Sequence, residues 1–224
     1  MISIVIPVLN EERIIHRNIS VFTELATVCD LIFVDGGSVD KGGELPLVRG
    51  RILGCEKGRA RQMNAGAREA RNDILLFLHA DNTVSSEVVE NIEKEIRQNG
   101  AVGGCLTQQI DKKGVIFRII ESQGNNRARR TKIFYGDQGI FVRKDVFERL
   151  GGFPEVPIFE DVLFTRKLRH EGKTVVLPDK IMVSARRWEK RGVVRTTFMF
   201  NTLLIMFKMG YPLEKTKKLY EDLR

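Results

Sequence analysis

The chain has 224 residues, of which 42% are hydrophobic and 29% are charged. This is the composition of an ordinary globular protein, and it excludes a disordered chain. Lysine and arginine outnumber the acidic residues by 37 to 29, a formal net charge of +8. Such a chain attracts anions, although a solvated basic surface explains the charge better when it is considered alone. Aromatic residues do not alternate with the basic clusters, so no nucleic-acid partner is expected.

Cysteine usage and the apolar segments indicate the compartment. Cys29, Cys55 and Cys105 are isolated and form no CxxC pair, which fits a reducing compartment and argues against a zinc site. The first residues, MISIVIPVLNEE, lack the basic region and the cleavage site of a signal peptide. The longest apolar stretch, Thr196–Gly210, is too short and too interrupted for a membrane span. We therefore expect a cytoplasmic protein.

The first half of the chain alternates strands and helices. Apolar runs predict strands over Ile2–Val8, Asp30–Val34 and Ile74–Leu78, with a short one near Arg51–Leu53. Between them, helical spacing of apolar or small residues predicts helices, which are Glu11–Leu25, Gly58–Arg71 and Ser86–Gln98. This order predicts a parallel sheet with right-handed crossovers, in which ligands bind at the carboxyl ends of the strands.

The pattern changes after residue 103. We expect strands at Gly103–Ile110, Gly136–Arg143 and Thr174–Leu177, and helices at Lys144–Leu150 and Phe159–Glu171. The basic stretch from residue 112 to 130 has no clear pattern. No repeat and no linker separates the two parts, so the second half is expected to pack against the first and complete a cleft.

Three predicted strand ends carry polar clusters. They are Asn10-Glu11-Glu12, Asp35-Gly36-Gly37-Ser38 and His79-Ala80-Asp81. Core packing gives no reason to place acids at two such ends and a histidine–aspartate pair at the third, whereas a shared nucleotide site does. Asp35 could accept a hydrogen bond from a nucleobase, although an ordinary turn explains it equally well.

Metal and phosphate ligands are predicted next to the third strand. Asp81 offers the hard oxygen that a divalent ion bridging two phosphates requires. His79 could ligate the ion, orient Asp81, contact phosphate or satisfy a backbone carbonyl. Arg59 and Arg61 lie at a predicted helix start that suits phosphate, although both could be solvated, Arg61 more readily than Arg59.

Carboxylates of the second half are candidates for a general base. Glu160 and Asp161 open a predicted helix, where acids favour the helix dipole, and that alone explains one of them. A carboxylate can also remove a proton from an attacking hydroxyl. Asp137 is the second candidate in this half.

Five segments in this order resemble the inverting glycosyltransferases of family 2, which have the GT-A fold. They are SIVIPVLNEE at the start, VDGGSVD at 34–40, GRARQMNAGA at 58–67, LLFLHAD at 75–81 and GGFPEVPIFEDVLFTRKLRHEG at 151–172. The resemblance covers residues 2 to about 190, and is strongest to a bacterial subgroup of small single-domain members. It implies a Rossmann-like, mostly parallel α/β sheet flanked by helices in one merged domain.

The resemblance also implies roles for matching positions. The residues implied in donor binding are Pro7, Leu9, Glu12, Asp35 and Gly36 for the nucleoside and Arg59 for the diphosphate. His79 and Asp81 match the DxD metal motif, which implies Mn²⁺ or Mg²⁺. Asp161, with Glu160 beside it, matches the catalytic base. Arg187 and Trp188 match a QxxRW motif that would close over the diphosphate or the acceptor.

Three departures from the family pattern bear on these roles. His79 replaces the first acid of DxD, which puts the choice of metal in question. Gly36 replaces the second acid of the common Asp-Asp-Gly-Ser motif, which could alter base recognition. Ser184 replaces the glutamine of QxxRW, which argues against processive polymer synthesis.

Together these features predict a metal-dependent, hexosyltransferase-like enzyme that moves a sugar, with inversion, from a nucleotide diphosphate-sugar to an acceptor hydroxyl. UDP-sugars are the first expectation for the donor and GDP-sugars the second. Residues 1–108 would bind the donor, residues 109–190 the acceptor, and residues 191–224 would form a helical tail.

Two other functions compete with this one. A sugar-phosphate nucleotidyltransferase would carry a basic glycine-rich loop after the first strand, where this chain has acidic residues. A nucleotide-sugar-binding protein without transferase activity would not need both Asp81 and Asp161. The tail, from Val193 to Met209, mixes apolar and basic residues. It would pack on the core or on a second subunit, as in a homodimer, or lie weakly at the inner face of a membrane.

Overall fold

The computed structural model describes residues 1–40 and 50–222. The described strands form one sheet of order β3-β2-β1-β4-β6-β5-β7. Their bounds are β1 Ile2–Val8, β2 Asp30–Asp35, β3 Arg51–Gly54, β4 Ile74–Phe77, β5 Gly103–Ile110, β6 Ile140–Arg143 and β7 Thr174–Val183. Strands β1 to β4 are parallel, β6 is antiparallel to β4 and β5, and β5 and β7 are parallel. The expectation of a mostly parallel sheet is confirmed.

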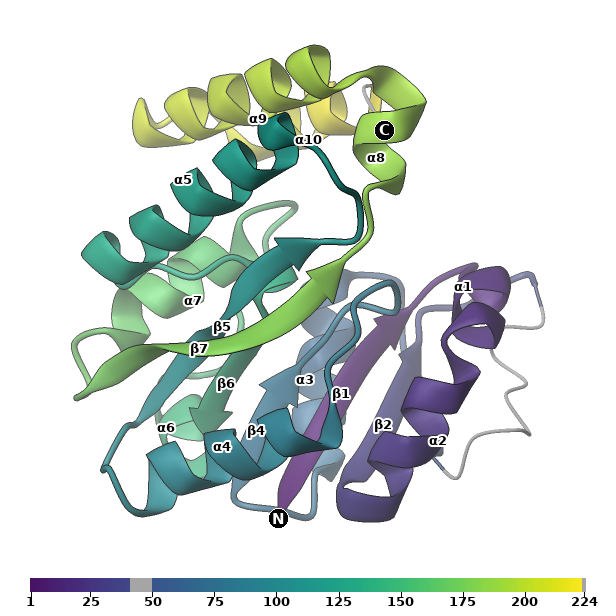
Figure 1. Cartoon of the computed structure of the whole chain (residues 1–224), viewed down its shortest axis with the longest axis vertical. Helices are drawn as coiled ribbons and strands as arrows, with labels where there is room; N and C mark the ends of the chain where they lie inside the picture. The colour runs from purple at the N-terminus through teal and green to yellow at the C-terminus, as the bar shows by residue number, and fades with distance from the viewer. Residues whose placement is uncertain (41–49, 223–224) are drawn as a thin grey trace.

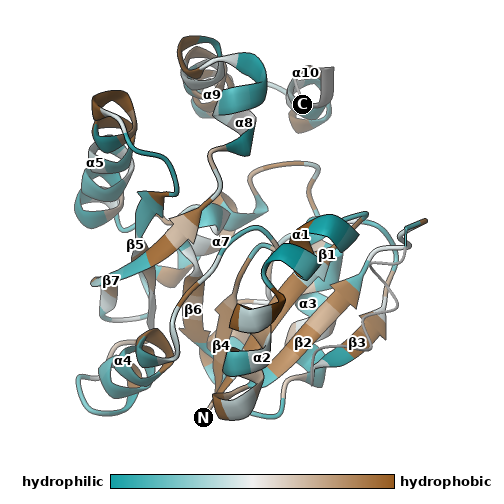
Figure 2. Ribbon diagram, turned by 45° about the vertical axis from the view of Figure 1, so that its right-hand side comes forward, coloured by the Kyte–Doolittle hydropathy of each residue, from teal (hydrophilic) through white to brown (hydrophobic). Residues whose placement is uncertain are grey.

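Helices cover both faces of this sheet, because alternate residues of a strand point to opposite sides. The helices are α1 Glu12–Arg17, α2 Ile19–Val28, α3 Arg59–Glu69, α4 Ser86–Arg97, α5 Val115–Thr131, α6 Lys144–Arg149, α7 Glu160–Leu168, α8 Arg186–Arg191, α9 Val193–Lys208 and α10 Leu213–Asp222. On β1, Ile4 and Ile6 belong to the core beneath α1, α2 and α4. Val5 belongs to the core beneath α3, α6 and α7. Figure 2 shows the hydrophobic strands between more hydrophilic helices.

Helix α3 lies close to the sheet, as its small residues predict. Ala60, Met63 and Ala67 are buried in the core shared with β1 and β2. A side chain at Gly66 would collide with Val5 and Val34. The close approach requires glycine here, and it brings the first turn of α3 to the carboxyl ends of β1 and β2.

Two predicted elements differ from the structure. The helix expected over Glu11–Leu25 is divided into α1 and α2 at Asn18, whose side-chain amide donates to the carbonyl of Ala80 at 3.2 Å. This bond ties the helix break to the loop after β4. The strand expected from residue 136 begins instead with a 3₁₀ turn, Gly136–Gln138, before β6.

The remaining helices gather near the carboxyl ends of the strands. Figure 1 shows α9 and α10 beyond the ends of β5 and β7, with α5 running back alongside these strands and α8 linking β7 to α9. The basic stretch without a clear pattern is therefore mostly helix α5. Among the described helices, none has the length and hydropathy needed to cross a membrane.

Candidate active site

A cavity of about 690 Å³ opens at the carboxyl ends of β1 and β4. Its walls come from six segments, namely the end of β1, the start of α3, the loop after β4, the segment leading into α7, the start of α8 and helix α10. Pro7, Leu9, Arg59 and Asp81 all line it. Residues far apart in the sequence are thus brought together where the parallel strands end.

The loops after β1 and β2 are linked to each other by side chains. Ser38 Oγ donates to Asp35 Oδ1 at 2.5 Å and accepts from the backbone N–H of Asn10 at 2.9 Å. The backbone amides of Gly37 and Ser38 also donate to Asp35. Glu12, Asp35 and Gly36 are not among the described residues that line the cavity. Asp35 holds its own turn in this geometry, and its contact with a nucleobase stays a prediction.

Gln62, which sequence reasoning did not single out, joins the two strand ends. Its buried amide donates to the carbonyls of Val8 at 2.7 Å and Val34 at 2.8 Å. A Cβ atom at Gly36 would lie 3.0 Å from the Gln62 side chain. The amide therefore occupies the space that a larger residue at position 36 would need. In the sequence, Gln62 is distinguished only as a polar residue among the small residues of a predicted helix.

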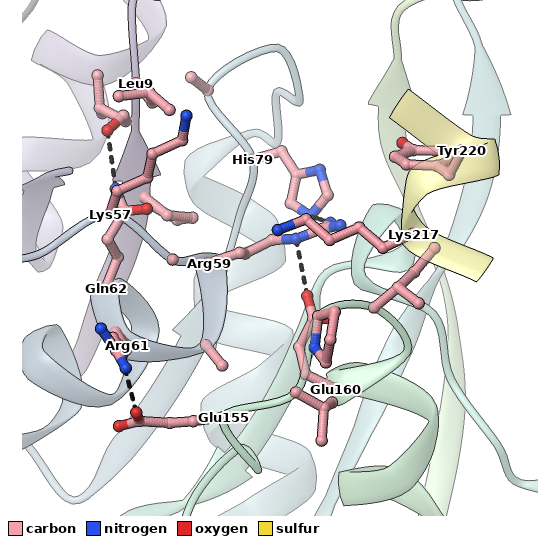
Figure 3. A pocket seen from close by; sticks show the side chains of 18 of the residues that line it. Leu9, Lys57, Arg59, Arg61, Gln62, His79, Glu155, Glu160, Lys217 and Tyr220 are labelled. Atoms are coloured by element: carbon pink, nitrogen blue, oxygen red, sulfur yellow. Dashed lines mark hydrogen bonds and ion pairs between the residues drawn. The ribbon is translucent and has the colours of Figure 1, made fainter. Parts of the chain in front are cut away.

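Arg59 lies at the centre of a polar network (Figure 3). Its Nε forms an ion pair with Glu160 Oε1 at 2.7 Å, and its Nη1 lies 3.2 Å from His79 Nε2. Since a guanidinium only donates, Nε2 is the acceptor and the neutral ring carries its proton on Nδ1. Arg61 instead pairs with Glu56 and Glu155 at the rim. Arg59 is therefore the arginine aimed at the inner cavity.

Burial controls the charge of Glu160, whose side chain is only 4% exposed. Desolvation raises the pKa of Glu160, the nearby Arg59 lowers it, and Asp161 raises it again, so the net direction is upward. Desolvation lowers the pKa of Arg59, but attraction to Glu160 and Asp161 outweighs this and the pKa rises. Glu160 is a structural partner of Arg59 in this arrangement rather than an open base.

Arg186 is a second residue that sequence reasoning missed. It lies 3.6 Å from both Asp81 Oδ2 and Glu11 Oε2 and lines the cavity. The predicted motif pointed instead to Arg187, whose side chain lies outside the described part, and to Trp188. Position 186 is recognisable only once α8 is placed against the end of β4.

A second cavity, of about 330 Å³, adjoins the first. Helices α5 and α9 and the end of β7 supply most of its apolar wall, which includes Ile120, Phe200, Leu203 and Leu204. Trp188 lines it and packs against Phe117 with ring centroids 6.3 Å apart. Asp137 and Asp161, two of the three carboxylates predicted as bases, line this cavity.

Asp161 is held close to His79 by a backbone turn. The Gly136 amide donates to Asp161 Oδ2 at 2.6 Å, and the Val162 amide donates to Oδ1 at 2.7 Å. A Cβ atom at Gly136 would lie 2.9 Å from His79 Nε2 and 3.4 Å from Asp161 Oδ2. Glycine at this position lets both side chains approach. Asp137 Oδ2 accepts a hydrogen bond from the side-chain amide of Gln108 at 3.0 Å.

Three buried polar atoms without a partner in the described chain belong to residues that line the second cavity. Asn82 Oδ1, Trp188 Nε1 and Thr197 Oγ1 are buried and hydrogen-bond to no atom of the described residues. All three residues line the second cavity. Buried polar groups are normally satisfied, so these three atoms are exceptions within the described residues.

The two cavities share one boundary. The residues that line both are Arg59, His79, Asp81, Ile158, Arg186 and Tyr220. A group transferred from a ligand in one cavity to a ligand in the other would pass this boundary. The arrangement suits a two-substrate transfer with a charged leaving group on one side and a carboxylate on the other.

The residues present fit a divalent ion only if a ligand shares it. Within residues 1–40 and 50–222, no group of three or more histidine, cysteine or acidic side chains could hold a metal. Asp81 is 26% exposed and lines both cavities. Mg²⁺ commonly binds one or two carboxylates together with substrate phosphates. Asp81 with a diphosphate meets that description, whereas His79 Nε2 already accepts from Arg59.

The mostly parallel sheet, with a cavity at the carboxyl ends of its strands, fits the fold expected of a GT-A glycosyltransferase. The sequence profile described as Glycosyl transferase family 2 matches residues 3–151. The chain belongs to this family, which confirms the resemblance drawn from the five motifs.

Two relatives illustrate the sequence similarity. An undecaprenyl-phosphate 4-deoxy-4-formamido-L-arabinose transferase of Photorhabdus laumondii is 26% identical over 157 residues, 63% of this chain and 48% of that protein. The probable glycosyltransferase YdaM of Bacillus subtilis is 23% identical over 216 residues, 84% of this chain and 50% of the relative. The chain spans about half the length of these relatives.

Solved structures share the fold. TarS residues 1–349 of S. aureus, in complex with UDP-GlcNAc, match with a TM-score of 0.65 at 18% identity, covering 82% of this chain and 58% of that one. The mannosyltransferase PcManGT of Pyrobaculum calidifontis, in complex with GDP-Man and Mn²⁺, matches with a TM-score of 0.66 at 19% identity, covering 81% and 56%.

Proposed function

We propose that the protein transfers a sugar, with inversion, from a nucleotide diphosphate-sugar in the larger cavity to an acceptor hydroxyl in the smaller one. The observation that carries this proposal is the shared boundary, where Arg59 and Asp81 line both cavities, with Asp161 beyond it in the smaller cavity. The expected donor-binding and acceptor-binding halves, residues 1–108 and 109–190, supply most of the two walls. Helices of the tail complete both.

The reaction requires two changes at the anomeric carbon. The acceptor oxygen attacks from the face opposite the diphosphate, and the bond from carbon to the diphosphate oxygen breaks. Asp161 takes the acceptor proton, with Asp137 as the fallback base. Arg59, held by Glu160, stabilises the negative charge that develops on the leaving diphosphate. A Mn²⁺ or Mg²⁺ ion bound by Asp81 and the diphosphate would neutralise part of that charge.

For the donor, UDP-sugars are our first choice and GDP-sugars our second. Solved structures of this fold contain UDP-GlcNAc in one case and GDP-Man with Mn²⁺ in another. Pro7 and Leu9, at the end of β1, line the larger cavity and would contact the nucleoside. Contacts from Glu12, Asp35 and Gly36 would require the donor to extend beyond that cavity.

The test of this proposal is thermal unfolding with UDP and GDP, each with Mn²⁺, Mg²⁺ or neither. A ligand that binds the native state raises its stability by mass action, so we expect the nucleotide to raise the unfolding temperature. The increase should be larger with metal, because the ion and the diphosphate are expected to bind together. Hydrolysis of the matching nucleotide-sugar would then separate an enzyme from a non-catalytic binding protein. Absence of a shift with any nucleoside diphosphate would contradict the proposal.

The acceptor would enter between α5 and α9, and the tail suggests where it comes from. Val194, Phe198 and Ile205 are exposed and fall within about 40° of one another around α9, and Met209, directly after the helix, is also exposed. Basic residues lie nearby, which are Lys190, Arg191, Arg195 and Lys208. We propose weak peripheral contact of this face with anionic membrane at the cytoplasmic side. The P. laumondii relative is named for a lipid phosphate substrate.

A second copy of the chain is the other occupant of that face. A homodimer would bury the same four side chains and block their contact with lipid. Sedimentation of the protein alone gives its mass in solution, and a dimer that binds no vesicles would contradict the membrane proposal.

A further inference from the structure

Helix α10 reaches the larger cavity from the far end of the chain. Its bounds, Leu213–Asp222, lie well beyond residues 3–151, which the family profile matches. Glu214, Lys217 and Tyr220 nevertheless line the cavity. Figure 3 shows Lys217 and Tyr220 projecting from α10 toward Arg59 and His79. The family pattern therefore leaves part of the cavity wall unassigned.

Helical geometry and packing orient this face of α10. Leu213, Lys217 and Tyr220 are spaced by four and three residues and share one face of the helix. The Tyr220 ring lies 6.4 Å from the ring of Phe200 on α9. Tyr220 also lines both cavities, so it lies where a sugar would pass between them.

The charges of the cavity favour an additional cation for a diphosphate. Arg59 is partly neutralised by Glu160 at 2.7 Å, and Arg186 lies 3.6 Å from Asp81. In all, five cations (Lys57, Arg59, Arg61, Arg186 and Lys217) and five carboxylates (Glu11, Asp81, Glu155, Glu160 and Glu214) line the cavity, so its formal charges balance before a diphosphate enters and each cation counts toward binding one. Lys217, from the opposite wall, can supply a point charge that binds phosphate.

We propose that α10 completes the donor site, with the Lys217 ammonium group bound to the diphosphate and Tyr220 beside the transferred sugar. This inference deepens the proposed function and rests on it. Lys217 becomes a donor-binding residue that lies outside the family motifs, and the tail becomes part of the site.

The chain offers a matched control on the same helix. Lys215 is exposed, lines neither cavity, and lies about 160° around α10 from Lys217. Lys217→Gln and Lys215→Gln remove the same charge and have similar helix propensity. Any difference between them therefore reports position rather than net charge.

The experiment is calorimetric titration of UDP, GDP, ADP and CDP, with Mn²⁺, into the full chain and both variants. Lys217→Gln is expected to weaken the preferred diphosphate roughly 10-fold or more, as for loss of a charge-assisted hydrogen bond. Lys215→Gln is expected to match the wild type. Thermal unfolding without ligand checks that both variants fold, and hydrogen exchange over residues 213–222 should slow when the diphosphate binds.

The possible failures are distinguishable. If the wild type binds a diphosphate and both variants bind it equally, with unchanged exchange in α10, this inference is wrong and the proposed function stands. If the wild type binds none of the four nucleotides, the proposed function is contradicted, and this inference with it.

Discussion

The two cavities of this protein differ in how they are built. The larger is lined by residues of strand ends and helix starts, such as Arg61 and Glu160, which belong to sequence motifs. The smaller takes much of its apolar wall from α5 and α9, through residues such as Ile120 and Leu204, which belong to none. In a family that shares a donor chemistry, the first wall can be recognised by motif. The second can vary, because many apolar side chains line a cavity equally well.

The largest expected effect is a loss of turnover without a loss of nucleotide binding, which would assign the base to the smaller cavity and the donor to the larger one. Asp161→Asn should lower turnover by roughly 10²–10⁴-fold, as for loss of a general base, because Asp161 faces only the smaller cavity. Affinity for the nucleotide should change little. Calorimetry and donor turnover measure the two quantities. A variant that turns over at the wild-type rate would move the base assignment to Asp137.

Asp81→Asn should act on the larger cavity and lower metal-dependent nucleotide binding together with turnover. We expect at least roughly a 10-fold loss of affinity in Mn²⁺, because losing even an outer-shell partner of a metal costs this much. Binding without metal should change less. If metal-dependent binding is retained in full, another carboxylate holds the ion.

Glu160→Gln tests the carboxyl group that supports Arg59. A folded-state pKa above the unfolded value means that the native state binds the proton more tightly. The stability from Glu160 is then fully present below the unfolded pKa and is lost as pH rises through the folded pKa. The free energy of unfolding of the wild type should therefore fall, relative to Glu160→Gln, as pH rises from about 4. Urea unfolding across pH 4–8 measures this, and an opposite slope would show a lowered pKa.

The smallest effect concerns the outer face of α9. Phe198 is 73% exposed, so Phe198→Ser should leave stability within about 0.5 kcal/mol and nucleotide binding unchanged. Co-sedimentation with anionic vesicles should decrease. Thr202→Ser on the same helix serves as a control that removes no exposed aromatic group. If both variants and the wild type co-sediment with vesicles equally, this face of α9 does not contact the membrane.

Several features could be predicted from the sequence because they depend on local patterns. Buried strands appear as apolar runs, and the small residues around Met63 predicted a helix packed close to the sheet. Parallel strands end at a common edge, which brings the segment after β1 near Asp81 without any knowledge of long-range contacts. The family followed from motifs at those same ends.

Other features required the tertiary structure, because they depend on contacts between distant segments. Gln62 fills the space beside Gly36 only after α3 is packed on β1 and β2. Arg186 reaches Asp81 only after α8 is placed over the end of β4. Lys217 reaches the larger cavity only because α10 packs on α9. No periodicity or spacing encodes such approaches, since each is set by how helices far along the chain pack over a sheet formed by its beginning.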